Sequence, residues 1–199
     1  MKKHYPDTSV QTPELYDSKI GGVFANLYVK PGYQNTCAVR MSYGLNRSGL
    51  KLPKAPSGAS VQGGDGYIYW LRVTDLKSEL ARRFKGADEE LSLTVIPTSL
   101  LADKDAMSRL FKTRVKEGQA FIDDKLASKS GIVAFEVTGW GDATGHFTLW
   151  DAVTKKLAYA DGHDQPDQSS YYFWLTKLTE GEGKSRLVQV IKVKFWELK

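Results

Sequence analysis

The chain is poor in the features that make disulfides, membrane anchors and secretory signals. Its 199 residues include one cysteine, Cys37, so no internal disulfide can form. No stretch approaches the ~18 consecutive apolar residues of a membrane span. The basic N-terminus lacks the apolar region of a secretory signal. We therefore expect a protein without membrane insertion that is made in the cytoplasm and whose secretion needs no classical signal peptide.

Histidine is also scarce, and its distribution argues against a metal or cofactor site. The three histidines are His4, His146 and His163. His163 lies among aspartates, but no second histidine at helical or strand spacing and no cysteine accompany it. The glycine-rich segment 63–66 lacks the lysine and the following helix of a phosphate loop. We expect no metal and no cofactor.

Positive charge exceeds negative charge without being concentrated. The chain has 28 lysines and arginines against 23 acidic residues, a formal net charge of +5, and its densest basic group is the segment 82–85. Nucleic-acid binding favours a basic stripe on one face, so we expect no nucleic-acid partner. The mild excess would attract an anionic partner.

Hydrophobic periodicity predicts helices first and strands later. Helices are expected over 18–27, 35–45, 73–84 and, after an N-cap at Asp103, 107–126, with a long surface loop over 46–66. Strands are expected over 131–137, 145–151, 156–161, 171–177 and 187–196. This order favours an α+β fold with N-terminal helices packed on an antiparallel sheet. We expect a single domain over 1–199, with residues 1–17 loosely ordered.

The single cysteine lies at the start of the predicted helix 35–45. With Asn35 as N-cap, Cys37 would be the second helical residue. The positive end of the helix dipole would then lower the pKa of the thiol, and unpaired backbone N–H groups could hold an oxyanion. The alternative is a small buried apolar residue, because free cysteine is among the most buried residue types.

His146 opens the alternating strand predicted over 145–151. Phe147 and Leu149 form the expected core side, so His146 would face the opposite side, toward the helix that carries Cys37. An imidazole there could act as general base for the thiol. The alternative is a structural histidine.

A third group can be sought from the register of the predicted hairpin. If Trp150 faces Leu157, Asp161 lies directly opposite His146 and could orient the imidazole. A slip of one residue would turn that carboxylate away. Asp164 is the reserve candidate.

Two segments resemble a known family. Asn-Thr-Cys-Ala-Val-Arg-Met-Ser-Tyr at 35–43, with Leu-Asn at 45–46, resembles the nucleophile segment of the fourth family of type VI secretion amidase effectors. So does Thr-Gly-Trp at 138–140, followed by Asp-Ala-Thr-Gly-His-Phe-Thr-Leu-Trp-Asp at 142–151. The order of the two segments and the helical region between them also match.

The resemblance implies a papain-like cysteine amidase of the class that includes NlpC-type wall peptidases. Such effectors enter rival Gram-negative bacteria through the type VI secretion machinery. There they cut peptidoglycan stem peptides between D-glutamate, through its γ-carboxyl, and diaminopimelate. A cognate periplasmic immunity protein protects the producer. The family's Cys and His carry over to Cys37 and His146. Asp161, Asp164 and Asp167 compete for the Asp, and the hairpin register favours Asp161.

Two other functions fit the same residues. One is a papain-like acyltransferase or deamidase that acts on a protein target. The other is a non-catalytic, basic, aromatic-rich module that binds glycan or peptide, in which Cys37 only packs.

Overall fold

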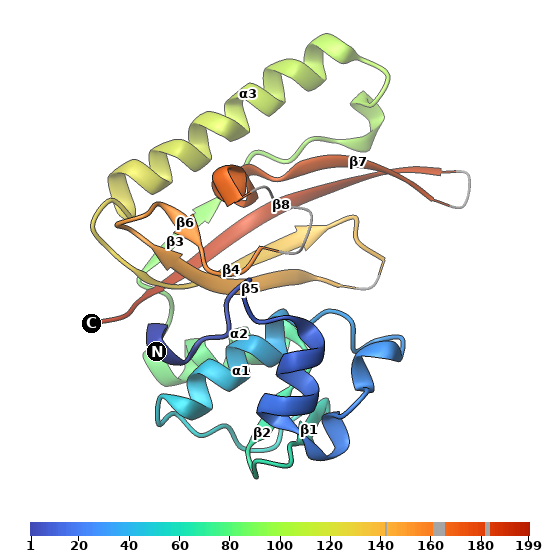
Figure 1. Cartoon of the computed structure of the whole chain (residues 1–199). Helices are drawn as coiled ribbons and strands as arrows, with labels where there is room; N and C mark the ends of the chain where they lie inside the picture. Colours follow the sequence, from blue (N-terminus) through green and yellow to red (C-terminus); the bar gives the residue numbers. More distant parts are fainter. Residues whose placement is uncertain (142, 161–165, 182–183) are drawn as a thin grey trace. The chain divides into compact units, whose positions relative to one another are not determined.

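Helices and an antiparallel sheet make up the computed structural model, which describes residues 1–141, 143–160, 166–181 and 184–199 (Figure 1). The chain forms two units. The first consists of Met1–Gly86, Phe147–Leu149 and the described part of Leu157–Asp164. The second consists of Ala87–His146, Trp150–Lys156 and the described part of Gln165–Lys199. The predicted α+β class is confirmed, whereas the single domain over 1–199 stays a prediction.

The first unit carries most of the short helices. Its elements are η1 (Lys2–His4), η2 (Glu14–Ile20), η3 (Gly22–Phe24), η4 (Leu27–Val29), α1 (Cys37–Arg47), β1 (Ser60–Gln62), β2 (Ile68–Trp70) and α2 (Val73–Phe84). Strands β1 and β2 pair antiparallel, with Ser60 opposite Trp70. Phe24 makes edge contacts with Tyr16 and Tyr69, each with ring centroids 5.2 Å apart, and these buried rings form the centre of an aromatic core.

The N-terminal residues take part in the first unit. Residues 1–17, expected to be loosely ordered, include η1 and bury the side chains of Tyr5, Leu15 and Tyr16. The Tyr5 hydroxyl donates to the carbonyl of Phe147 at 3.4 Å. Burial of these apolar side chains favours an ordered segment, because apolar area removed from water stabilises by about 25 cal/mol per Å².

Two expectations for the first unit are wrong. No continuous helix covers 18–27, because η2 ends at Ile20 and the next residue, Gly21, has a left-handed φ of 66°. Gly22 follows, and a Cβ there would lie 2.7 Å from the backbone of Gly64, so this crossing requires glycine. The loop over 46–66 is also shorter than expected, since α1 runs to Arg47 and β1 begins at Ser60.

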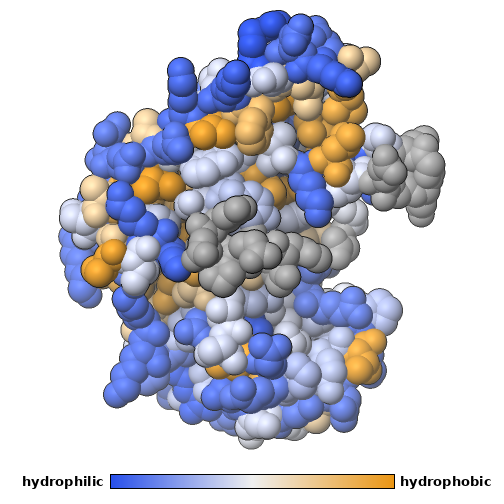
Figure 2. Space-filling view, turned by 45° about the horizontal axis from the view of Figure 1, so that its top comes forward, coloured by the Kyte–Doolittle hydropathy of each residue, from blue (hydrophilic) through white to orange (hydrophobic). Residues whose placement is uncertain are grey.

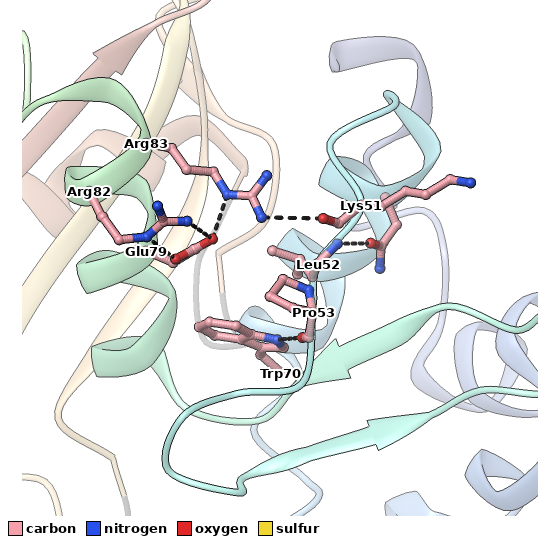
Figure 3. A network of polar contacts seen from close by, with 8 residues as sticks. Lys51, Leu52, Pro53, Trp70, Glu79, Arg82 and Arg83 are labelled. Atoms are coloured by element: carbon pink, nitrogen blue, oxygen red, sulfur yellow. Dashed lines mark hydrogen bonds and ion pairs between the residues drawn. The ribbon is translucent and has the colours of Figure 1, made fainter.

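Side chains from outside the loop after α1 donate hydrogen bonds to its backbone carbonyls (Figure 3). The indole of Trp70 donates to the carbonyl of Pro53 at 2.6 Å. Arg83 of α2 donates to the carbonyl of Lys51 at 3.3 Å and also to the carboxylate of Glu79. The predicted helix 73–84 is confirmed. Arg83, which pairs with Glu79 inside this helix, also donates a hydrogen bond to the loop.

The second unit is built on an antiparallel sheet. Its helical elements are η5 (Thr98–Leu100), α3 (Lys104–Ala120), η6 (Phe121–Lys125) and η7 (Pro166–Trp174). The strands run in the order β3 (Glu89–Ser92), β8 (Lys184–Glu197), β4 (Gly131–Thr138), β5 (Gly145–Asp151) and β6 (Lys156–Leu157), and β7 (Thr176–Gly181) also pairs with β8. Residues of β5 and β6 belong to both units. Strand β8 pairs antiparallel with β3, β4 and β7 (Figure 1).

The predicted cap of α3 is confirmed. The Asp103 carboxylate accepts from the backbone N–H groups of Asp105 and Ala106 at 3.1 and 2.9 Å. Gly118 does not interrupt the helix, and a Cβ there would lie 2.7 Å from the ring of Trp174. The expected strand over 171–177 is wrong, because η7 continues to Trp174 and the strand begins at Thr176.

No helix among the described residues is long and apolar enough to cross a membrane. The face in Figure 2 is mostly hydrophilic, and its hydrophobic side chains form separate patches.

Candidate active site

Cys37 is the first residue of α1, and Thr36 is the N-cap. The prediction of Asn35 as N-cap was therefore wrong by one residue. The Cys37 side chain is buried, with 6% of its surface exposed. The Thr36 side chain does not cap this helix start, and the first turn carries no acidic residue. A thiol in this position lies at the positive end of the helix dipole, which favours its anion.

Two buried polar side chains hold the residue that precedes Cys37. Arg40, one helical turn further, donates from Nε to the Thr36 hydroxyl oxygen at 2.9 Å. The Tyr159 hydroxyl forms a hydrogen bond with the same oxygen at 3.1 Å. The guanidinium of Arg40 also lies over the ring of Tyr159, 4.1 Å from its centroid. These contacts fix the start of α1 against the segment that follows β6.

The rest of the Arg40 guanidinium is satisfied by the N-terminal segment. Nη1 donates to the carbonyls of Pro6 and Asp7 at 3.2 and 3.0 Å, and Nη2 donates to the Thr12 hydroxyl at 3.5 Å. Only 2% of Arg40 is exposed. A charged group almost never lies this deep unless it is paired, and every acceptor here is neutral.

Sequence reasoning missed Thr36, Arg40 and Tyr159. In a helix pattern a charged residue reads as part of the solvated face, so Arg40 was not considered for the core. The signal that could have found it is local: both neighbours of Arg40, Val39 and Met41, are apolar and buried, so the helix has little room for a solvated face.

Two tyrosines lie close enough to Cys37 and Arg40 to interact with their charges. Burial raises the pKa of the Tyr5 hydroxyl well above its usual range, opposed by a hydrogen bond with Thr148 and by the charge of Arg40. Burial also raises the pKa of Tyr16, with a Cys37 thiolate adding to the shift and Arg40 opposing it. Both hydroxyls are therefore neutral near pH 7.

His146 lies on β5 in the second unit and is fully buried. Its ring stacks on Tyr172 of η7, with centroids 4.8 Å apart and planes at 26°. The ring of Phe135 of β4 lies 6.3 Å from the imidazole, centroid to centroid, with the two planes at 25°. Both faces of β5 are buried, so elements pack against each side of this strand. The aromatic contacts set the plane of the imidazole.

The hairpin register agrees with the prediction as far as the structure describes it. The Ala158 N–H donates to the Leu149 carbonyl at 2.8 Å, which is the register that places Trp150 opposite Leu157. Strand β6 is shorter than expected and ends at Leu157. Asp161 and Asp164 lie outside the described residues, as does the side chain of Asp167, so the choice of the orienting carboxylate stays a prediction.

The two central candidates belong to different units, Cys37 to the first and His146 to the second. Each has a fixed local environment: a helix start for Cys37 and an aromatic stack for His146. The pairing of thiol and imidazole stays a prediction.

A family model matches residues 33–174 of the chain and is described as type VI secretion system (T6SS), amidase effector protein 4, or Tae4. The matched range contains both Cys37 and His146. No match was found among functionally curated proteins.

Solved structures show the same fold. The type VI effector Tae4 from Enterobacter cloacae has 24% identity and a TM-score of 0.59, covering 96% of this chain and 89% of that one. A chain of the Tae4–Tai4 effector–immunity complex from Enterobacter cloacae has the same identity and TM-score, with coverage of 96% and 91%. A chain of the Tae4–Tai4 complex from Salmonella Typhimurium has 22% identity and a TM-score of 0.58, with coverage of 100% and 92%. The predicted papain-like α+β fold is confirmed.

Proposed function

The chain belongs to the Tae4 family of type VI secretion amidase effectors, which are antibacterial hydrolases directed at peptidoglycan, and we propose that it cleaves stem peptides with Cys37, His146 and Asp161. The bond cut joins the γ-carboxyl of D-glutamate to diaminopimelate. Membership of this amidase family favours a hydrolase over a non-catalytic binding module. It also favours a hydrolase over an acyltransferase or deamidase that acts on a protein.

In the proposed reaction the Cys37 thiolate attacks the carbonyl carbon of the amide. The tetrahedral intermediate collapses to a thioester as the C–N bond breaks, and His146 gives its proton to the departing amine of diaminopimelate. His146 then removes a proton from the attacking water, the C–S bond breaks, and the γ-carboxyl product leaves while the Cys37 thiolate and the protonated His146 are restored. Asp161 accepts from the second imidazole nitrogen and fixes the tautomer.

The position of Cys37 as first residue of α1 is the observation that carries this proposal. The helix dipole stabilises a thiolate there, and the N–H groups of the first turn point toward an oxyanion formed beside it. The side chain of the N-cap residue Thr36 does not cap this turn. A cysteine that only filled core space would have no reason to lie at such a helix start.

We further propose that the chain is delivered by the type VI secretion machinery to the periplasm of a target bacterium. Solved Tae4 proteins form complexes with the immunity protein Tai4. By analogy, a cognate periplasmic immunity protein would inhibit this chain and protect the producer. The formal net charge of +5 would speed encounter with an acidic inhibitor.

Digestion of purified Gram-negative peptidoglycan tests the chemistry. Fragments identified by mass should carry new D-glutamate γ-carboxylates and new diaminopimelate amines. Cys37→Ala should lose this activity with an unchanged circular dichroism spectrum, and Cys37→Ser should be nearly as inactive. Val153→Ala, at a side chain that is 89% exposed, is the control and should digest normally. Normal digestion by Cys37→Ala would refute the proposal.

Expression in two compartments tests the place of action. The chain should be harmless in the cytoplasm of a Gram-negative host and should lyse that host when fused to a periplasmic signal. The Cys37→Ala form should be harmless in both compartments. Equal toxicity of the unmodified chain in both would contradict a wall substrate and would favour an acyltransferase or deamidase acting on a protein.

A further inference from the structure

Arg40 is a buried cation whose bonding partners are all neutral. Its acceptors are two hydroxyls, from Thr36 and Thr12, and the backbone carbonyls of Pro6 and Asp7. No ion pair joins Arg40 to a carboxylate in the described part of the chain. Burying a charge without an opposite charge costs several kcal/mol. Such an arrangement persists when the fold or the activity needs the charge.

The guanidinium lies at the start of α1. Side chains in helices point back toward the N-terminus, and the Nε bond to the Thr36 hydroxyl places the charge beside the residue that precedes Cys37. The first turn holds no acidic residue, although helix starts favour acids. The positive end of the dipole and the positive charge of Arg40 therefore act together at Cys37.

The described tyrosines and Asp7 around Arg40 do not supply an opposite charge. Burial keeps the hydroxyls of Tyr5 and Tyr16 protonated at neutral pH. Tyr159 presents its ring face to the guanidinium and its hydroxyl to Thr36. The Asp7 carboxylate accepts from the backbone N–H of Ser9 at 2.9 Å and from the Ser9 hydroxyl. Arg40 donates to the backbone carbonyl of Asp7 and not to its carboxylate. Among the residues that the structure describes, the candidate anion that remains is the Cys37 thiolate.

We propose that Arg40 is a positioning residue that holds the start of α1 through Thr36 and keeps Cys37 as a thiolate at neutral pH. The benefit of this role to peptidoglycan cleavage rests on the proposed function. The ionisation of Cys37 itself can be measured without substrate. Arg40 touches neither substrate nor the reacting carbonyl in this scheme. It acts through the ionisation of the nucleophile.

The test is the rate of Cys37 alkylation by iodoacetamide as a function of pH. An opposite charge near an ionisable group lowers the pKa of an acid such as a thiol, by roughly 1–3 units for a close neighbour. Arg40→Met should therefore raise the apparent pKa of Cys37 by at least about one unit and slow alkylation at pH 6 by about tenfold. Arg40→Lys keeps the charge and should stay within about half a unit of the unmodified chain. The shift should persist in a His146→Ala background, which separates Arg40 from any imidazolium effect.

Two further variants separate charge from anchoring. Tyr159→Phe and Thr36→Val weaken the hydrogen bonds but retain Arg40, so they should lower the melting temperature and leave the alkylation pKa nearly unchanged. Arg40→Gln is the second neutral variant and should behave like Arg40→Met. The proposal is overturned if a folded neutral variant keeps the alkylation pH profile of the unmodified chain. It is also overturned if Arg40→Lys shifts that profile as far as Arg40→Met does. Failure of both neutral variants to fold would show a structural role only and would overturn it as well.

Failure of this proposal differs from failure of the proposed function. If Arg40→Met shifts the alkylation profile while Cys37→Ala still digests peptidoglycan, the thiolate is real but is not the nucleophile. If Cys37→Ala is inactive and the alkylation profile is the same with and without the Arg40 charge, the amidase proposal is supported and Arg40 has only a packing role.

Discussion

Arg114→Met should destabilise the second unit strongly, because Arg114 joins three segments through one buried guanidinium. Arg114 is fully buried on α3. It donates to the Thr176 hydroxyl at 2.9 Å and to the carbonyls of Thr94, Leu175 and Val190 at 2.6, 3.0 and 2.7 Å. Methionine has a similar length but offers no donor.

The expected cost follows from the acceptors that would be left behind. The Leu175 carbonyl would keep the Val190 N–H at 3.1 Å, and the Thr176 hydroxyl would keep its bond to the Trp174 carbonyl at 2.9 Å. The carbonyls of Thr94 and Val190 would lose a charged donor. A buried group left unsatisfied costs about 1–3 kcal/mol. Two such groups, less the gain from removing a buried charge, give about 3 kcal/mol.

Guanidinium denaturation followed by far-UV circular dichroism measures this cost as the change in unfolding free energy. Arg114→Lys is the matched control: it retains a charge with three donors but lacks the planar fork, so about half of the loss should return. Burial lowers the pKa of Arg114, yet a guanidinium remains protonated across the usual range, so the loss should not depend on pH between 6 and 8. A loss below about 1 kcal/mol for Arg114→Met would refute this reasoning.

Three further outcomes are expected. His146→Ala should abolish peptidoglycan cleavage and slow the alkylation of Cys37 at pH 6, measured by mass shift. Asp161→Ala should reduce turnover by about 10²- to 10⁴-fold and Asp164→Ala by much less, measured by release of diaminopimelate amines. Glu79→Gln should cost about 1–2 kcal/mol at pH 7, because hydrogen bonds from two arginines lower the pKa of this carboxyl below 4.5.

Each of these outcomes has a result that contradicts it. An unchanged alkylation profile for His146→Ala would show that imidazole and thiol do not meet. Reversal of the two aspartate results would mean that the hairpin register slips after the described residues. A carboxyl with a depressed folded pKa stabilises above its unfolded pKa and stops doing so as pH falls through the folded value. The cost of Glu79→Gln should therefore fall as pH drops through the lowered pKa of Glu79, and a pH-independent cost would contradict the ion-pair explanation.

The sequence predicted the elements whose signals are local. Periodicity and a capping carboxylate located α2 and α3, and the Asp103 cap is confirmed. The strands β1, β2 and β3 were missed because three or four residues carry too little periodicity. The segment 171–174 was read as strand because aromatic residues favour sheets, whereas packing of the adjacent buried Tyr172 and Phe173 selects a helical turn.

For the candidate site, the sequence placed Cys37 within one residue of its helix position but gave no sign that Arg40 is buried. The reason is that a helix pattern describes only near neighbours. The partners of Arg40 are the carbonyls of Pro6 and Asp7, more than thirty residues earlier, and the ring of Tyr159, more than a hundred residues later. Only the tertiary structure brings these groups to one guanidinium.

Among the described residues, each unit contains one buried arginine that donates to neutral oxygens, Arg40 in the first and Arg114 in the second. The two arginines differ in whether a carboxylate lies nearby. Arg114 has a carboxylate one turn further along its helix. Burial lowers the pKa of Arg114, the charge of Glu117 opposes that shift, and Glu117 accepts from the Thr94 N–H at 2.9 Å. Its charge is thereby partly balanced, so its role is to tie strands and helix together. Arg40 has no such carboxylate among the residues that the structure describes, and its helix begins with Cys37. Arg114 variants should thus change the unfolding free energy and leave the alkylation pKa of Cys37 unaltered, whereas the neutral variants Arg40→Met and Arg40→Gln should change both.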